Sequence, residues 1–85
     1  MLDIPIIAIV PSIGRIPFGS SNGLWHGQRL WAYEIRDEGG KRIEIPAGHV
    51  VISEIGEDWA HVVPSYTAVG LSLCTYRLHC RTIGR

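Results

Sequence analysis

Short stretches of alternating apolar and polar residues, separated by glycine and proline, run along most of the chain. The first clear stretch covers residues 29–37, where one side of an extended strand carries Trp31, Tyr33 and Ile35. Gly39-Gly40 then supplies a turn in which positive φ is tolerated, and we place Ile43 and Ile45 on the inward side of the returning strand. This pattern predicts a β-hairpin.

The second half of the chain predicts further strands. Residues 49–55 and 59–63 flank a short polar turn and form a second predicted hairpin, which Pro64 ends. The final run, residues 71–83, is the longest strand candidate. No window of eleven or more residues has helical spacing of apolar positions free of Gly and Pro. The sequence therefore predicts an all-β domain of five or six strands, folded as a small barrel or a two-layer sandwich.

The N-terminal third is apolar without alternating. Isoleucines fall on both sides of an extended strand in residues 4–10, and residues 11–27 contain two prolines and four glycines. Two interpretations stay open for this segment: an extended arm that lies on a neighbouring chain, or a core strand buried on both faces. We expect a single domain, residues 1–85, in which residues 1–27 form this arm or first strand plus a long loop and residues 28–85 form the antiparallel β core.

The alternation also predicts which side chains fill the core. One side of each predicted strand is more apolar than the other, and we assign that side to the interior. The residues assigned in this way are Trp31, Tyr33, Ile35, Ile43, Ile45, Val51, Val63, Tyr76 and Leu78. Truncation of Leu78 or Ile43 to Ala is expected to cost roughly 2–5 kcal/mol, which is enough to unfold a small domain.

Composition favours association. A chain of 85 residues has a thin core, yet 46% of its residues are hydrophobic, and eight Lys and Arg balance eight Asp and Glu to a formal net charge of zero. A neutral chain does not have the charge of a typical nucleic-acid binder. With two cysteines and an apolar opening too short to span a bilayer and not preceded by basic residues, we expect a reducing compartment, the cytoplasm or a virion, and neither secretion nor a membrane.

The cysteines lie close to a histidine in residues 74–80, which raises the question of a metal site. In a continuous strand, Cys74 and Cys80 face one side and His79 faces the other. The two sulfurs would also be about 20 Å apart, because a strand rises roughly 3.3 Å per residue. We therefore interpret both cysteines as small apolar core residues and predict neither a metal nor a disulfide between them.

Catalytic and cofactor motifs are weak. The segment "GSSNG" matches the G-x-S-x-G pattern with Ser21 in the nucleophile position, but a nucleophile elbow requires a strand-turn-helix context that this chain does not offer. Glu57 and Asp58 near His61 are more simply turn and strand residues. No glycine-rich segment has the context of a phosphate or dinucleotide site. We predict a protein without enzymatic activity and without a cofactor.

A row of basic side chains lies on the outward side of the last predicted strand. It consists of Arg77, His79 and Arg81, with Arg85 at the end of the chain. With Trp25, Trp31 or Tyr66 as stacking platforms, such a row suits single-stranded nucleic acid. The competing interpretation is a solvated edge strand whose charges prevent edge-to-edge pairing.

The apolar surplus favours a protein-protein interaction module or a structural subunit of a homo-oligomer or larger assembly. The residues expected to contact other chains are Ile4, Ile6, Ile7, Ile9, Ile13, Phe18 and Trp25. Extended apolar arms are used by subunits of large assemblies, virus particles included, which is an analogy of architecture only. The alternative is a small β-barrel that binds single-stranded nucleic acid through the basic row.

Overall fold

The computed structural model describes residues 4–10, 12–65 and 78–83 of the chain. Regular structure within these residues is β-strand, apart from one short 3₁₀ turn, η1 (Ser20–Asn22). The strands are β1 (Ile4–Pro5), β2 (Ile7–Val10), β3 (Ile13–Ile16), β4 (Arg29–Glu38), β5 (Lys41–Ile55), β6 (Ala60–Pro64) and β7 (Leu78–Thr82). The all-β prediction is confirmed, and none of the described residues forms a helix long and apolar enough to cross a membrane.

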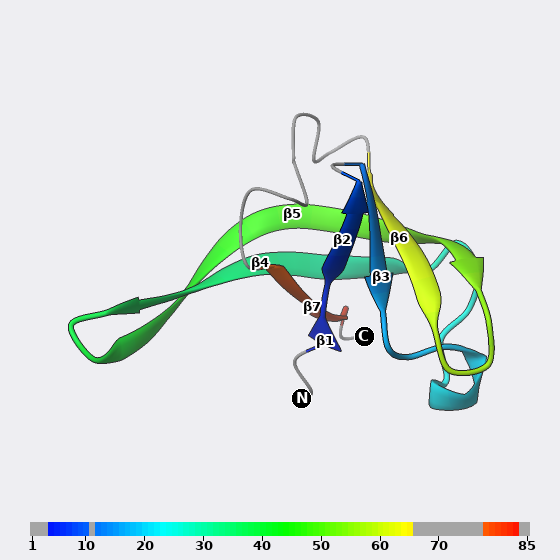
Figure 1. Ribbon diagram of the computed structural model, residues 1–85, viewed down its shortest axis with the longest axis horizontal. Helices are drawn as coiled ribbons and strands as arrows, with labels where there is room; N and C mark the ends of the chain where they lie inside the picture. Colours follow the sequence, from blue (N-terminus) through cyan, green and yellow to red (C-terminus); the bar gives the residue numbers. More distant parts are fainter. Residues whose placement is uncertain (1–3, 11, 66–77, 84–85) are drawn as a thin grey trace.

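The described strands form one antiparallel sheet in the order β1-β7-β4-β5-β6-β3-β2. The two ends of this order, β1 and β2, are consecutive pieces of a single stretch that only Ile6 separates. Its first piece pairs with β7, its second piece pairs with β3, and the Ile6 amide donates to the Leu78 carbonyl oxygen at 3.0 Å. The sheet therefore curls into a nearly closed barrel whose seam is the N-terminal stretch (Figure 1).

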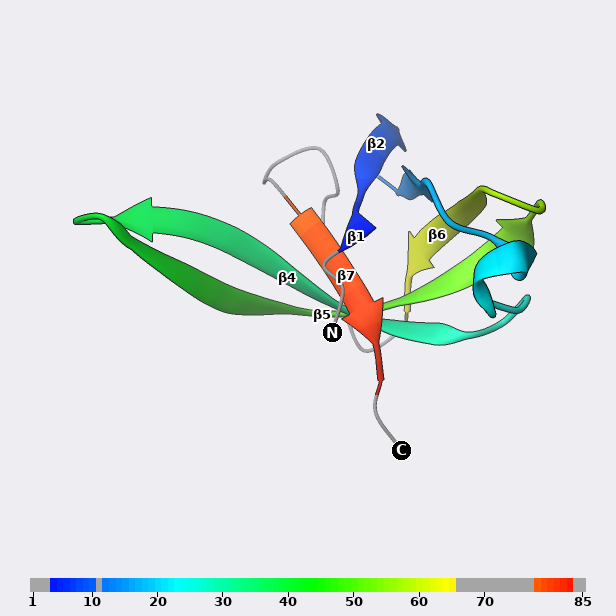
Figure 2. The same ribbon diagram turned by 90° about the horizontal axis from the view of Figure 1, so that it is seen from below.

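Strands β4 and β5 form a hairpin that is much longer than the barrel wall. Gly39 and Gly40 make its turn with φ of 59° and 80°, the left-handed region that glycine adopts without a steric penalty. β4 pairs with β7 only over Leu30–Glu34, and β5 pairs with β6 only from Val50 onward. Residues 35–45, which we call the hairpin arm, pair with no strand other than β4 and β5 among the described residues and project away from the barrel in both ribbon views (Figures 1 and 2).

The core is made of aliphatic side chains of moderate size. It consists of Ile4, Ile6, Ile16, Leu24, Leu30, Ala32, Val50, Ile52, Ala60, Val62, Leu78 and Cys80. In β4, β5 and β6 these are the side chains of the parity opposite to the one predicted. A small barrel has just enough interior for such residues, so the bulkier Trp31 remains half-buried on the outer face.

The predicted core list is therefore only partly correct. Tyr33 and Leu78 are buried, but Tyr33 lies outside the core cluster, under Arg81 on the outer face. Ile43 is 37% exposed, a correction with a clear physical cause, because it lies on the hairpin arm beyond the barrel. The remaining described residues of the list are half-buried: Trp31, Ile35, Ile45, Val51 and Val63. Tyr76 is outside the described residues.

Candidate protein-protein interface

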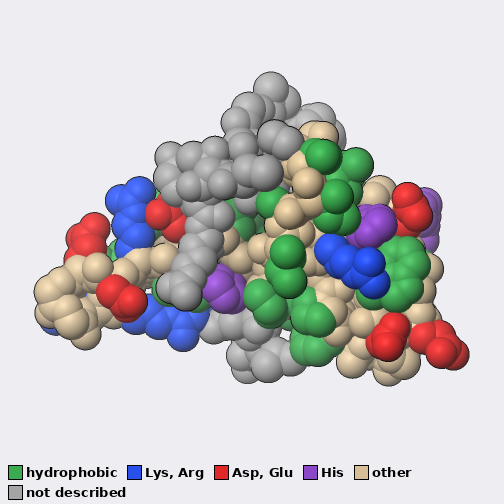
Figure 3. All heavy atoms as spheres, in the orientation of Figure 1, with side chains coloured by type: hydrophobic (Ala, Val, Ile, Leu, Met, Phe, Trp, Pro, Cys, Tyr) green, Lys and Arg blue, Asp and Glu red, His purple; other side chains and the backbone are tan. Residues whose placement is uncertain are grey.

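Four aliphatic side chains form an apolar surface on the outer face of β2 and β3. We call Ile7, Ile9, Val10 and Ile13 the β2–β3 patch. Ile7 is 65% exposed, Ile9 52% and Val10 43%, while Ile13 is half-buried. Figure 3 looks onto this side of the molecule and shows hydrophobic side chains gathered over β2 and β3. Contiguous exposed apolar surface of this kind marks interaction sites on soluble domains.

Strand pairing explains why these side chains lie together. Ile7 is opposite Arg15 and Val10 is opposite Ile13, with the alternate residues Ala8 and Gly14 turned toward the core. The register shifts between Ala8 and Val10, which leaves Ile9 and Val10 both exposed. Most of the patch thus comes from β2, the second half of the N-terminal stretch. The first half of that stretch, with Ile4 and Ile6, is buried where the barrel closes.

A cation borders the patch, and a carboxylate lies two strands further along the sheet. Arg15 is exposed, its guanidinium lies 5.1 Å from the centre of the Trp59 ring, and it makes no ion pair with the described residues. Its cross-strand neighbour His61 packs against Trp59 and lies 3.9 Å from the Glu54 carboxylate, whose side chain is 69% exposed. A partner would therefore meet an apolar centre with a cation at its edge, and the Glu54 carboxylate on the far side of β6.

The residues expected to bind a partner are distributed over several places. Ile4 and Ile6 fill the chain's own core, so the core-strand interpretation applies to them and they are not surface residues. Ile7, Ile9 and Ile13 are brought together in the patch. Phe18 is half-buried against the core and lines a cavity of about 240 Å³ with Ile4, Asn22, Leu24 and Thr82, none of which is charged.

Trp25 is 58% exposed but lies apart from the patch. It lines a separate depression with Gly27, Gln28, Arg29 and Ile83, and no residue of the patch contributes to it. The structure adds features that the sequence analysis did not single out, namely Val10, the charges of Arg15 and Glu54, and the hairpin arm. For Val10 the signal was present in the sequence, since it continues the apolar run of the isoleucines.

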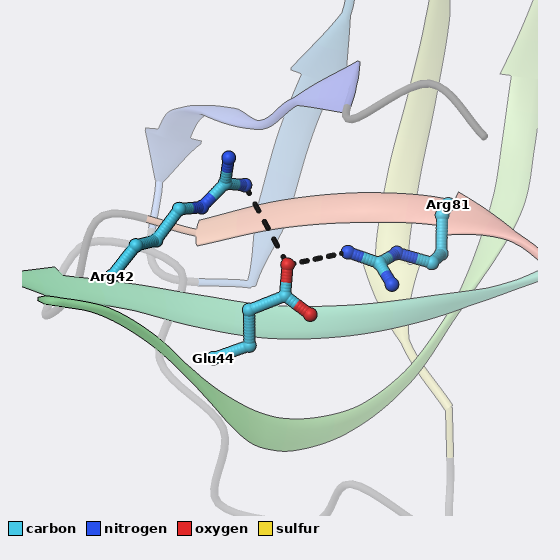
Figure 4. A network of polar contacts seen from close by, with 3 residues as sticks. All are labelled: Arg42, Glu44 and Arg81. Carbon is cyan, nitrogen blue, oxygen red and sulfur yellow. Dashed lines mark hydrogen bonds and ion pairs between the residues drawn. The ribbon is translucent and has the colours of Figure 1, made fainter.

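The basic row is only partly visible, because Arg77 and Arg85 lie outside the described residues. His79 and Arg81 face outward as predicted, while Leu78 and Cys80 on the same strand face the core. His79 stacks on Tyr33 with ring centres 6.1 Å apart. Arg81 lies over the Tyr33 ring at 4.1 Å, and its Nη2 donates to Glu44 Oε2 at 2.8 Å (Figure 4).

These contacts engage Arg81 within the chain. Hydrogen bonds to the Tyr33 side chain and to Glu44 raise the pKa of the Arg81 guanidinium above its ordinary value. Glu44 also forms a longer ion pair with Arg42, at 3.6 Å, so one carboxylate lies between two guanidinium groups. Arg81 thus holds the root of the hairpin arm against β7, a role that does not leave it as a freely available phosphate ligand.

Cys80 occupies the core with no solvent exposure, and its thiol is free. Burial raises the pKa of this thiol from its ordinary 9.0 to about 12, which keeps it protonated and unreactive near neutral pH. No group of three or more His, Cys, Asp or Glu side chains in the described part of the chain is placed to hold a metal ion. Cys74, the other cysteine, is outside the described residues.

The serine of the "GSSNG" segment forms hydrogen bonds that connect its loop to the β5–β6 turn. Ser21 donates its hydroxyl to the Glu57 carbonyl oxygen at 2.5 Å, and its amide donates to the same oxygen at 2.9 Å. The Ser20 amide donates to the Gly56 carbonyl in the same way. The segment therefore fastens η1 to the β5–β6 turn. Glu57 and Asp58 are exposed in that turn, and the carboxylate near His61 is Glu54 instead.

No protein-family model matches the sequence, and no curated protein matches it either.

Proposed function

We propose that this protein is a non-enzymatic assembly subunit that associates with further copies of itself through the β2–β3 patch. The observation that carries the proposal is the exposure of Ile7, Ile9 and Val10, which adjoin one another on the outer face of a domain with zero net charge. Burial of each such side chain in an interface is worth roughly 1.5–3 kcal/mol before the cost of association.

The occupant we commit to is a second copy of the chain. The patch supplies apolar surface at its centre and a cation, Arg15, at its side, and the carboxylate of Glu54 lies two strands beyond Arg15. A surface with both charge signs can meet a copy of itself, or another part of the same chain, without placing like charges together. No charge excess on the chain as a whole opposes its self-association.

Single-stranded nucleic acid remains the alternative and has less support. Its main described cation, Arg81, is engaged by Glu44 and Tyr33, and His79 is half-buried against Tyr33. An enzymatic role also has less support, because the Ser21 hydroxyl donates to a backbone carbonyl rather than to a base.

The test is the mass of the chain in solution. Light scattering coupled to size exclusion is expected to give a mass above that of one chain, rising with protein concentration. Ile9→Glu should return the mass to that of one chain, because it places a charge in the centre of the interface. Ile83→Glu is the matched control, since Ile83 is similarly exposed at 47% but lies outside the patch.

A wild-type chain that stays monomeric at the highest attainable concentration would overturn the proposal. If the Ile83→Glu variant loses association to the same extent as Ile9→Glu, the patch is not the interface. Titration of a labelled single-stranded oligonucleotide at low salt addresses the alternative, and tight, salt-dependent binding by a monomeric chain would favour it.

A further inference from the structure

The hairpin arm leaves apolar side chains partly exposed. Ile43 is 37% exposed, and Ile35 and Ile45 are half-buried although no third strand flanks them among the described residues. Arg36 pairs with Glu34 at 2.6 Å on the face that Ile43 and Ile45 share. A two-stranded ribbon is marginally stable in water by itself, so an arm of this kind gains stability from a surface on which to lie.

The arm is nevertheless held in a defined direction. Its root is fastened to the barrel by the contact of Glu44 on β5 with Arg81 on β7 (Figure 4). The arm points away from the barrel, whereas the β2–β3 patch lies on the barrel wall (Figures 1 and 2). An arm that is fixed in this direction meets a patch on another molecule and not its own.

We propose that the hairpin arm of one copy lies across the β2–β3 patch of the next copy, so that the chain assembles head to tail. This inference rests on the proposed function, because it takes self-association through the patch as given and names the surface that occupies it. The face of the arm that carries Ile43 and Ile45 would cover Ile7, Ile9 and Val10 of the neighbour.

Dimensions and charges of the two surfaces match. The four to five residues on each strand of the arm extend about 15 Å at roughly 3.3 Å per residue, which covers the four residues of β2. The end of the arm carries Asp37 and Glu38 on one strand and Lys41 and Arg42 on the other. Glu38 and Lys41, the pair that flanks the turn, supply one charge of each sign to meet Arg15 at the edge of the patch and Glu54 two strands beyond Arg15.

A head-to-tail contact has a consequence that a two-fold contact does not. Each copy uses its arm once and its patch once, so association continues from copy to copy until a ring closes or a filament grows. A chain with a defective arm still has an intact patch, and a chain with a defective patch still has an intact arm.

The experiment mixes two complementary variants. Ile43→Glu disables the arm and Ile9→Glu disables the patch, and thermal unfolding of each variant verifies that it is folded. Each variant alone is expected to run as one chain in light scattering, and an equimolar mixture is expected to form a 1:1 complex of two chains. The mixture has one working arm and one working patch, which accounts for the complex and for its failure to grow.

The outcomes separate this inference from the proposed function. If the Ile43→Glu variant associates as well as wild type while the Ile9→Glu variant does not, the patch binds another patch, and only the head-to-tail inference fails. If the folded variants do not combine, the inference also fails. If wild type is monomeric, both proposals fail.

A second measurement does not depend on a charged substitution. A photo-crosslinking amino acid at position 43 of wild type, mixed with isotopically labelled chain, is expected to give crosslinked peptides from residues 7–15 of the other copy. Crosslinks that join position 43 only to the arm of another copy would overturn the inference.

Discussion

Glu44 on the hairpin arm accepts a hydrogen bond of 2.8 Å from Arg81 on β7, two strands away in the sheet. The Arg81 side chain is 24% exposed and covers the Tyr33 ring, so the pair lies partly out of solvent. This contact connects the arm to the last strand of the barrel. It links the direction of the arm, on which the head-to-tail assembly depends, to one ion pair on the outer face.

A double-mutant cycle measures this link. Arg81→Gln and Glu44→Gln are each expected to lower the free energy of unfolding, with a coupling energy above zero, because both substitutions remove the same hydrogen bond. Arg42→Gln is the control, because its 3.6 Å contact to the same carboxylate is more exposed and should change stability by less than about 0.5 kcal/mol. Urea unfolding followed by tryptophan fluorescence gives all of these values. A coupling energy of zero would show that the pair does not fasten the arm.

The sequence was sufficient to predict the all-β class and both hairpins. It was not sufficient to predict which side of β4 faces the core. Leu30 and Ala32 on one side and Trp31 and Tyr33 on the other are all apolar, so hydrophobicity alone cannot choose between them. The choice is made by the barrel interior, which accepts the smaller pair. That constraint exists only once the sheet has curled.

The hairpin register, by contrast, could have been obtained from the sequence. A two-residue turn at Gly39-Gly40 places Glu38 opposite Lys41, which in turn places Ile35 opposite Glu44 and Ile43 opposite Arg36. Ile35 and Ile43 therefore face opposite sides of the ribbon and cannot both point into one core. The alternation within each strand does not contain this relation, which appears only when the two strands are paired through the turn. The candidate patch was predicted in Ile7, Ile9 and Ile13, but its separation from the buried Ile4 and Ile6 required the seam between β7 and β3.

The corrected core gives a matched pair of truncations. Ile52→Ala is expected to lower the free energy of unfolding by roughly 2–5 kcal/mol, because Ile52 is completely buried. Ile43→Ala removes the same atoms from a side chain that is 37% exposed on the arm, and it should cost less than about 1 kcal/mol in the isolated chain. Chemical denaturation at low protein concentration, where association does not contribute, provides the comparison. Equal losses would contradict the assignment of the two faces.

Gly19 is required by a close approach between two loops. A Cβ at this position would collide with the Gly56 carbonyl oxygen, where the η1 segment is fastened to the β5–β6 turn. Gly19→Ala is therefore expected to cost roughly 1–3 kcal/mol, as overpacking does. Gly23, with φ of 85° and open space around it, is the control. Asn should be tolerated at position 23, since it adopts left-handed conformations, but not at position 19. Thermal unfolding that ranks the two Asn variants equally would contradict this explanation.

Burial of Cys80 predicts how its thiol reacts and how stability depends on pH. In a Cys74→Ser background, Cys80 is expected to be inert toward an aromatic disulfide reagent in the native chain and reactive in denaturant. Because folding raises the pKa of this thiol to about 12, the unfolded chain loses the proton first as the pH rises above about 9. The stabilisation is complete below pH 9 and declines toward pH 12, by up to about 4 kcal/mol at about 1.4 kcal/mol per pKa unit. Cys80→Ala in the same background isolates this contribution from those of tyrosine and lysine, and its unfolding free energy should fall less steeply over that range. Parallel curves for the two chains, or rapid labelling of the native thiol, would place Cys80 at the surface instead of in the core.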